Sequence, residues 1–264
     1  LSSKVLTGIL RDSIGYRGVV ITDALMMKAV HERYGHSRAA VLALQAGADM
    51  PLAQGEKDEQ AAAIAAIGQA LQDGRLSQAQ LQKALTRLDA LAEAYPVAPR
   101  DYPAAQREAD DALMHRAWAA GLTALRGARP PARVQALRVI TQASVVSDGV
   151  SEAGLPAESV AALFEAFADV EFVHLADLRR LQLGDLPQDG RLNVLVSNHR
   201  GRFGGAARET RPDLHLALWN PFQVLDVPAP ALITWGYADG AMVALKAWLE
   251  GKGAATATPP VTLN

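Results

Sequence analysis

The first hundred residues alternate short apolar runs with stretches in which apolar residues recur every three or four positions, which predicts alternating strands and helices. The spacing predicts helices over Lys4–Ser13 and Ser37–Ala46, the second ending at Gly47. Between them, Val19–Thr22 is a β-branched run without polar alternation, which is typical of a parallel strand covered on both faces. Ala48–Leu52 is the next predicted strand.

Longer helical stretches follow these elements. Glu56–Leu71 is rich in alanine and is predicted to be helical, and Ser77 is placed to cap a helix over Gln78–Ala94. The proline-rich segment 95–103 indicates a linker, after which a further helix is expected over Ala104–Gly121.

A second domain is predicted from the point where the pattern restarts. Pro130 and Pro131 interrupt the chain, and strands spaced with helices begin again after Val134. We therefore expect one domain over residues 1–125 and another over residues 126–264. The predicted strands of the second are Leu137–Thr141, Val170–His174, Leu192–Ser197, Leu214–Trp219 and Ala231–Trp235, with helices over Ala157–Ala168 and Asp239–Gly251.

Composition narrows the class of protein. Half of the 264 residues are hydrophobic and 20% are charged, as in globular proteins that bury a sizeable core. A net charge of -2 gives no reason to expect nucleic acid as a partner, and no basic amphipathic helix or long apolar run indicates a membrane. The absence of cysteine excludes disulfides, thiolate metal sites and a cysteine nucleophile. It leaves the compartment open, with a cytoplasmic and a secreted protein both compatible.

The strongest chemical signal is GVVITDALMMKAV, residues 18–30, in which Asp23 directly follows the predicted strand. Functional side chains of parallel α/β folds gather at the carboxyl ends of strands, so Asp23 is a candidate nucleophile, base or ligand. Aspartate is also a favoured helix N-cap, and ALMMKAV could be the helix that it caps. From the local pattern alone, the cap is the favoured interpretation.

The same segment resembles the part of family 3 glycoside hydrolases that carries the catalytic nucleophile. The matching features are Gly18, the apolar strand, Thr22 to Leu25, Met27 and Ala29. Further likenesses to the family lie in residues 40–52, in residues 77–91, and in LWNPFQVLD (218–226), PALITWGYAD (230–239) and PPVTLN (259–264).

This resemblance implies an α/β protein that is a C-terminal portion of the family's chain. Residues 1–125 would be the C-terminal part of a catalytic (β/α)8 TIM-like barrel with linker helices. Residues 126–264 would be an αβα sandwich domain with a mainly parallel sheet.

The residues after Asp23 resemble one branch of the family. Ala24-Leu25 stands where β-glucosidases usually carry tryptophan, as is usual in β-N-acetylglucosaminidases. The resemblance implies a retaining enzyme that removes terminal β-linked N-acetylglucosamine or N-acetylhexosamine from glycans, peptidoglycan fragments among them. Asp23 would attack the anomeric carbon, and water would hydrolyse the glycosyl ester, with no metal or organic cofactor. Met27 would contact the N-acetyl group.

The acid/base of that branch is a histidine on a loop with a Lys-His-Phe-Pro-Gly-like motif, which the 264 residues do not contain. The opening at Leu1 also resembles a helix inside a domain. We therefore expect the missing N-terminal part of the same protein to supply the acid/base, and this chain alone to be inactive. Two alternatives stay open: a β-N-acetylglucosaminide phosphorylase, and a non-catalytic carbohydrate- or anion-binding α/β module in which Asp23 is a helix cap.

Other polar residues favour structural roles. His31 or His36 could line the pocket around Asp23, but surface or capping roles are favoured for both. Asp49 could approach the site from the neighbouring strand, but a structural role near the start of that strand is favoured.

The glycine-rich segment 197–208 could bind an anion through its backbone and Arg200, Arg202 and Arg208, although a surface loop is favoured. Tryptophans could stack on sugars, but their apolar contexts favour core packing. These are Trp118, Trp219, Trp235 and Trp248.

Overall fold

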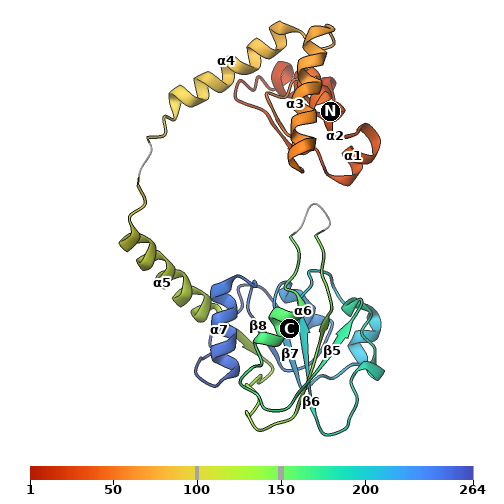
Figure 1. Cartoon of the computed structure of the whole chain (residues 1–264), viewed down its shortest axis with the longest axis vertical. Helices are drawn as coiled ribbons and strands as arrows, with labels where there is room; N and C mark the ends of the chain where they lie inside the picture. Colours follow the sequence, from red (N-terminus) through yellow and green to blue (C-terminus); the bar gives the residue numbers. More distant parts are fainter. Residues whose placement is uncertain (99–100, 148–151, 264) are drawn as a thin grey trace. The chain divides into compact units, whose positions relative to one another are not determined.

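The computed structural model describes residues 1–98, 101–147 and 152–263. The chain forms two compact units, Leu1–Asp101 and Tyr102–Asn264 (Figure 1). The expected division at residues 125 and 126 is therefore corrected, because the segment 102–125 packs with the second unit.

The first unit contains a two-stranded parallel sheet of β1 (Ile21–Ala24) and β2 (Met50–Leu52). Its helices are η1 (Lys4–Ser13), α1 (Lys28–Tyr34), α2 (His36–Ala46), α3 (Lys57–Gln72) and α4 (Gln78–Ala94).

The core of the first unit lies around α2. Ala39, Ala40 and Ala43 of this helix are fully buried, and α3 buries Ala63 and Ala70 beside it. Small side chains on both helices allow them to approach closely. The sheet therefore rests on a tightly packed helical layer.

Local chemistry sets the ends of these helices as predicted. Gly47 ends α2 with φ +106°, a left-handed conformation that a side chain would strain. The hydroxyl of Ser77 accepts a hydrogen bond from the backbone N–H of Gln80 at 3.1 Å, and the Gln80 side chain returns to Ser77, which completes a capping box at the start of α4.

The helix expected over Lys4–Ser13 is confirmed with these bounds; it is a π-helix, and its buried polar residue is Arg11. The expected strand Val19–Thr22 was wrong in two respects. The strand begins at Ile21 rather than at Val19, because its ladder with β2 pairs Ile21 with Met50. It is also not covered on both faces, since Ile21 is 54% exposed.

The second unit is built on a six-stranded sheet in the order β3-β8-β7-β6-β4-β5. Only β3 runs antiparallel, and the other neighbours are parallel. The strands are β3 (Thr123–Leu125), β4 (Leu137–Gln142), β5 (Val170–Leu175), β6 (Leu192–Ser197), β7 (Leu214–Ala217) and β8 (Ala231–Ile233).

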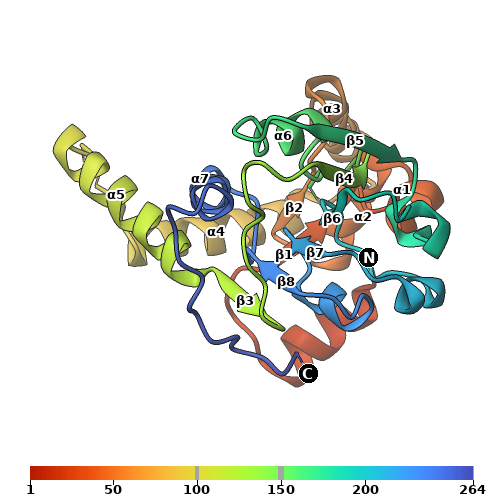
Figure 2. The same cartoon turned by 90° about the horizontal axis from the view of Figure 1, so that it is seen from below.

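Both faces of this sheet are covered. On one face, α6 (Ala157–Ala162) and α7 (Asp239–Leu249) pack side chains such as Trp248 onto the strands. On the other face, η2 (Leu178–Arg180) and η4 (Gly205–Glu209) pack Leu178 and Ala207 into the core, and η3 (Leu183–Asp185) lies between them in sequence. Beyond them, η5 (Pro221–Leu225) follows β7, and α5 (Ala104–Gly121) lies beside α7 (Figure 2).

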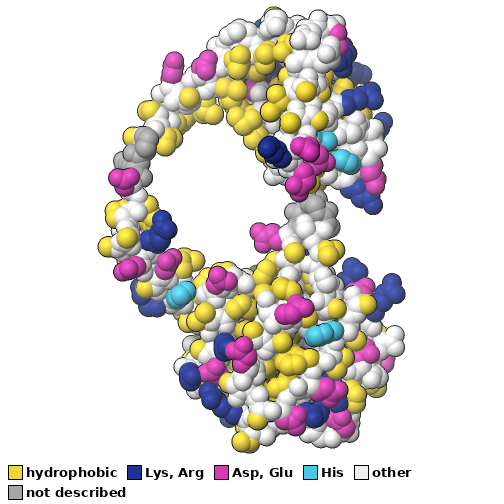
Figure 3. All heavy atoms as spheres, in the orientation of Figure 1, with side chains coloured by type: hydrophobic (Ala, Val, Ile, Leu, Met, Phe, Trp, Pro, Cys, Tyr) yellow, Lys and Arg dark blue, Asp and Glu magenta, His cyan; other side chains and the backbone are white. Residues whose placement is uncertain are grey.

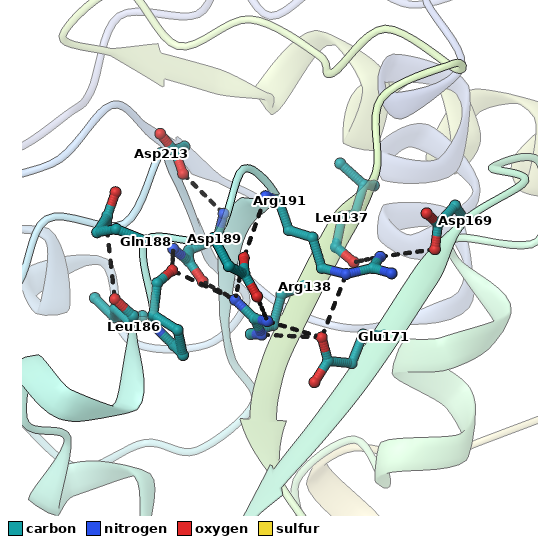
Figure 4. Close-up of polar contacts among 11 residues, drawn as sticks. Leu137, Arg138, Asp169, Glu171, Leu186, Gln188, Asp189, Arg191 and Asp213 are labelled. Carbon is teal, nitrogen blue, oxygen red and sulfur yellow. Dashed lines mark hydrogen bonds and ion pairs between the residues drawn. The ribbon is translucent and has the colours of Figure 1, made fainter.

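At the amino ends of the strands an ion-pair network ties β4, β5 and the segment before β6 together (Figure 4). Arg138, whose side chain is 5% exposed, pairs with Glu171 at 2.9 Å and with Asp189. Arg191 pairs with Asp169 at 2.7 Å and approaches Glu171. Since these charged groups satisfy one another, we assign this network a structural role.

The second unit confirms most predicted elements. Leu192–Ser197 and Ala104–Gly121 have the predicted bounds, whereas the helix expected over Ala157–Ala168 ends at Ala162. In the part of the chain that the structure describes, no helix has both the length and the apolar character needed to cross a membrane.

Candidate functional site

Asp23 lies at the carboxyl end of the small parallel sheet. It is the third residue of β1, and its side chain is exposed. One carboxylate oxygen, Oδ1, accepts the backbone N–H of Ala24 at 2.7 Å. The hydroxyl of Thr22 accepts the N–H of Leu52 at 2.9 Å, which fixes the end of β1 against the end of β2. The carboxylate is therefore accessible and stands on a defined backbone.

Asp23 is not the cap of the helix that follows it. Helix α1 begins at Lys28, and its N-cap is Met27, without a side-chain capping bond. A turn closed by Met27 N–H to the Ala24 carbonyl separates the strand from the helix. The favoured local interpretation of Asp23 was wrong, because the chain makes this turn before the helix begins.

The amino ends of the same strands are held by Asp49. Its carboxylate accepts hydrogen bonds from Arg11 at 2.6 Å, from the backbone N–H of Val20 at 2.8 Å, and from Arg87 at 2.6 and 2.9 Å. Burial alone raises the pKa of Asp49, but the hydrogen bonds from Arg87 and Val20 and the charges of both arginines lower it overall. The expected structural role of Asp49 is confirmed, and Asp49 lies at the end of the sheet opposite Asp23.

The candidate residues that follow Asp23 in the sequence differ in how deeply they are buried. Met27 is half-buried just before α1, and His31 is exposed on α1, as expected for a surface residue. His36, expected at the surface, is instead 7% exposed at the start of α2. Neither of its ring nitrogens has a hydrogen-bond partner among the described residues. No group of three or more His, Asp or Glu side chains in that part of the chain could hold a metal ion.

The three candidate arginines of segment 197–208 have different surroundings. Arg200 lines a pocket that also receives Arg179 of η2, a residue that the sequence pattern did not single out. Arg202 instead pairs with Asp226 at 2.6 Å, and Arg208 is exposed on η4. Of the three predicted arginines, Arg200 therefore lines this pocket, and Arg179 lines it as well.

The tryptophans are more exposed than core packing predicts. Trp248 is buried in the core, whereas Trp118, Trp219 and Trp235 are half-buried. Trp235 has φ +63°, which is uncommon for a bulky residue, and its indole N–H donates to the hydroxyl of Thr123 at 3.0 Å.

The comparisons with known proteins relate the first unit to one family of enzymes. Residues 1–91 match the model described as the glycosyl hydrolase family 3 N terminal domain. The chain also aligns over 99% of its length with the structure of a glycoside hydrolase family 3 β-N-acetylglucosaminidase from Paenibacillus, with 26% identity and a TM-score of 0.64. Over residues 1–91 the chain is therefore similar to glycoside hydrolase family 3. The resemblance seen in the sequence is confirmed, but residues 1–91 correspond to the family's N-terminal domain rather than to a C-terminal portion.

Two curated relatives each match about a third of the chain. An uncharacterized secreted glycosyl hydrolase from Arthroderma benhamiae is 39% identical over 92 residues, and Beta-hexosaminidase A from Pseudoalteromonas piscicida is 30% identical over 104 residues. These alignments cover 34% and 36% of this chain, but only 26% and 17% of the relatives. The chain likewise covers 54% of the Paenibacillus structure.

Proposed function

We propose that Asp23 is the nucleophile of a retaining glycosidase that removes terminal β-linked N-acetylglucosamine or a related N-acetylhexosamine. The observation that carries this proposal is the exposed carboxylate at the carboxyl end of a parallel strand, which caps no helix. The match of residues 1–91 to a glycosyl hydrolase family 3 domain suggests a chemistry for that carboxylate, because it lies within the matched residues.

In the proposed reaction the Asp23 carboxylate attacks the anomeric carbon while the leaving oxygen receives a proton. A glycosyl ester forms, and water then cleaves it with retention of configuration. The N–H of Ala24, 2.7 Å from Oδ1, orients the carboxylate. The other oxygen, Oδ2, is then the atom that attacks.

The proposed substrate class rests on two observations. Ala24-Leu25 follows the nucleophile, and the Paenibacillus neighbour is described as a β-N-acetylglucosaminidase. We assign Met27, four residues after Asp23 and half-buried, to contact with the N-acetyl group. Glycans that contain N-acetylglucosamine, including peptidoglycan fragments, are the proposed substrates.

The two units of the chain would form different parts of the complete enzyme. We infer that the first unit is the end of a TIM-like barrel, since β1 and β2 are neighbouring parallel strands connected through helices. The second unit would be the αβα sandwich. The 264 residues do not contain the family's lysine–histidine motif, so a remaining part of the same protein would supply the acid/base. The chain alone is then expected to show no turnover.

The decisive experiment changes Asp23 in the full-length protein. Asp23→Asn is expected to reduce kcat/KM for a β-N-acetylglucosaminide by on the order of 10⁴-fold or more while the fold is retained. Asp12→Asn, at another exposed aspartate of the first unit, is the matched control and should leave kcat/KM unchanged. Full activity of Asp23→Asn would refute the nucleophile and support a non-catalytic module.

A chemical test separates a nucleophile from a residue that only supports the site. In Asp23→Gly, azide should enter the space left by the carboxylate and restore cleavage of an activated substrate, with an α-glycosyl azide as product. Trapping with a 2-fluoro glycoside should label Asp23 in the unmodified enzyme. Labelling of another carboxylate would reassign the nucleophile.

The phosphorylase alternative concerns the second half of the same reaction. Phosphate would replace water as the acceptor and release a glycosyl phosphate. Product analysis of the full-length enzyme with and without phosphate decides between the two, because only a phosphorylase needs phosphate for turnover.

A further inference from the structure

A pocket of about 440 Å³ lies at the carboxyl ends of the central strands of the second unit. After β4 the chain forms β5 on one side of it and then crosses to form β6 on the other side. The strand order therefore reverses at this place, which is where open parallel α/β sheets bind ligands. Residues at the end of β4 and just after β5 and β6 line the pocket, among them Gln142, Ala176 and His199.

The charged side chains in the described lining are both arginines. Arg179 enters from η2 after β5, and Arg200 follows β6. No carboxylate belongs to the lining residues that the structure describes. Guanidinium groups that converge on one pocket suit a ligand with a doubly charged oxyanion.

Arg179 is held in place before any ligand arrives. Its Nε and Nη2 donate to Asp177 at 2.8 and 3.0 Å, and its carbonyl accepts the N–H of Gly204 at 2.8 Å. These bonds leave the Nη1 hydrogens without a partner in the described chain. A fixed side chain with spare donors binds an anion with less loss of conformational entropy.

The wall beside Arg179 has space because residue 201 is glycine. A Cβ atom on Gly201 would lie 2.8 Å from Cδ of Arg179 and 3.5 Å from its Cγ. Any side chain at this position would displace Arg179, whereas the backbone of Gly201 does not have the left-handed conformation that requires glycine.

His199 adds a polar group to the same wall. It is 3% exposed, and Gln223 Nε2 lies 3.3 Å from its Nδ1. Because that amide nitrogen can only donate, we assign the proton of the neutral ring to Nε2. Nε2 has no partner among the described residues. A buried donor without an acceptor favours a bound group or water that supplies one.

We propose that this pocket binds the phosphate group of a small molecule, either inorganic phosphate or a sugar phosphate, with Arg179 and Arg200 as its charged ligands. The site lies within the second unit and is independent of the proposed role of Asp23. It explains why Arg179, which lies far from the glycine-rich segment in sequence, is locked beside Gly201.

Calorimetric titration of the whole chain tests this proposal. Sodium phosphate and a hexose 6-phosphate are titrated separately, with sodium chloride at the same ionic strength as the reference. Saturable binding of at least one phosphate probe is expected, and tighter binding of the ester would identify a sugar phosphate as the source. Binding of neither probe above the chloride reference would overturn the proposal.

Two adjacent arginines provide a matched pair of variants. Arg179 and Arg180 both pair with Asp177, but only Arg179 lines this pocket. Arg179→Gln should weaken phosphate binding at least about tenfold, the effect of losing a charge-assisted hydrogen bond, while Arg180→Gln should change it less than about twofold. Equal effects of the two variants would show non-specific attraction and overturn the site.

Gly201→Ala keeps every charge and tests the position of Arg179 alone. It should weaken binding as Arg179→Gln does, with an unchanged tryptophan emission spectrum to confirm the fold. Binding at the level of the unmodified chain would overturn the assigned role of Arg179, and this variant also decides the question if Arg179→Gln does not fold.

Discussion

The buried carboxylate of Asp49 offers a direct test of what holds the first unit together. Its side chain is fully buried and joins η1 to α4 through Arg11 and Arg87, while it also accepts the backbone N–H of Val20. Asp49→Ala would remove the acceptor from both guanidinium groups and from this N–H. The perturbation therefore acts on three segments of the unit together.

The expected loss follows from this geometry. Removing one partner of a buried ion pair costs about 3–5 kcal/mol, because the remaining charge is left without compensation. Both arginines are largely buried, with side chains 11% and 26% exposed, so solvent can only partly replace Asp49. Since small domains are stable by about 5–15 kcal/mol, the first unit should lose a large part of its stability.

Hydrogen exchange measured by mass spectrometry localises the effect. In Asp49→Ala, protection of peptides from residues 1–98 should fall by a factor of about 10² to 10⁴. All four tryptophans lie in the second unit, so the urea transition followed by tryptophan fluorescence should not move.

Asp89→Ala removes an exposed carboxylate from α4 and is the matched control. Unchanged protection in Asp49→Ala, or an equal loss in Asp89→Ala, would refute the reasoning.

Two further predictions concern pH and capping. Burial lowers the pKa of His215 to about 3 and that of His199 to about 4, below the unfolded value of about 6.5. Their contribution to stability is therefore complete above pH 6.5 and is lost as the pH falls toward the folded pKa values. The free energy of unfolding of the second unit, followed by tryptophan fluorescence in urea, should fall by about 2 kcal/mol per ring between pH 7 and pH 5, and a constant value would contradict this. Ser77→Ala should destabilise α4 by about 1 kcal/mol, seen as faster exchange in peptides from 78–94; unaltered exchange would show that the capping box is dispensable.

Elements with a strong local signal were predicted well. Gln78–Ala94 has a capping serine at its start, and Leu192–Ser197 is a continuous apolar run, so each is defined by its own residues. The start of β1 was missed by two residues, because pairing with β2 rather than the apolar run decides where the ladder begins. The spacing of apolar residues in Lys4–Ser13 predicted a helix but did not distinguish a π-helix from an α-helix.

Pairings that are distant in sequence explain the other corrections. The boundary expected at residue 125 moved because Thr123 pairs with Ile233, 110 residues away. Asp23 could be a cap or an exposed carboxylate until the turn before α1 was known. The pocket at Arg179 depends on Gly201, which no local pattern connects to it.

The sequence by itself determined the resemblance to one family and the order of helices and strands, because apolar periodicity, caps and a specific motif are properties of neighbouring residues. Only the tertiary structure decided that Asp23 is exposed, that Asp49 is enclosed by two arginines, and that Arg179 and Arg200 line the same pocket. These three features depend on contacts between segments that are distant in the sequence, and packing and long-range hydrogen bonds determine those contacts.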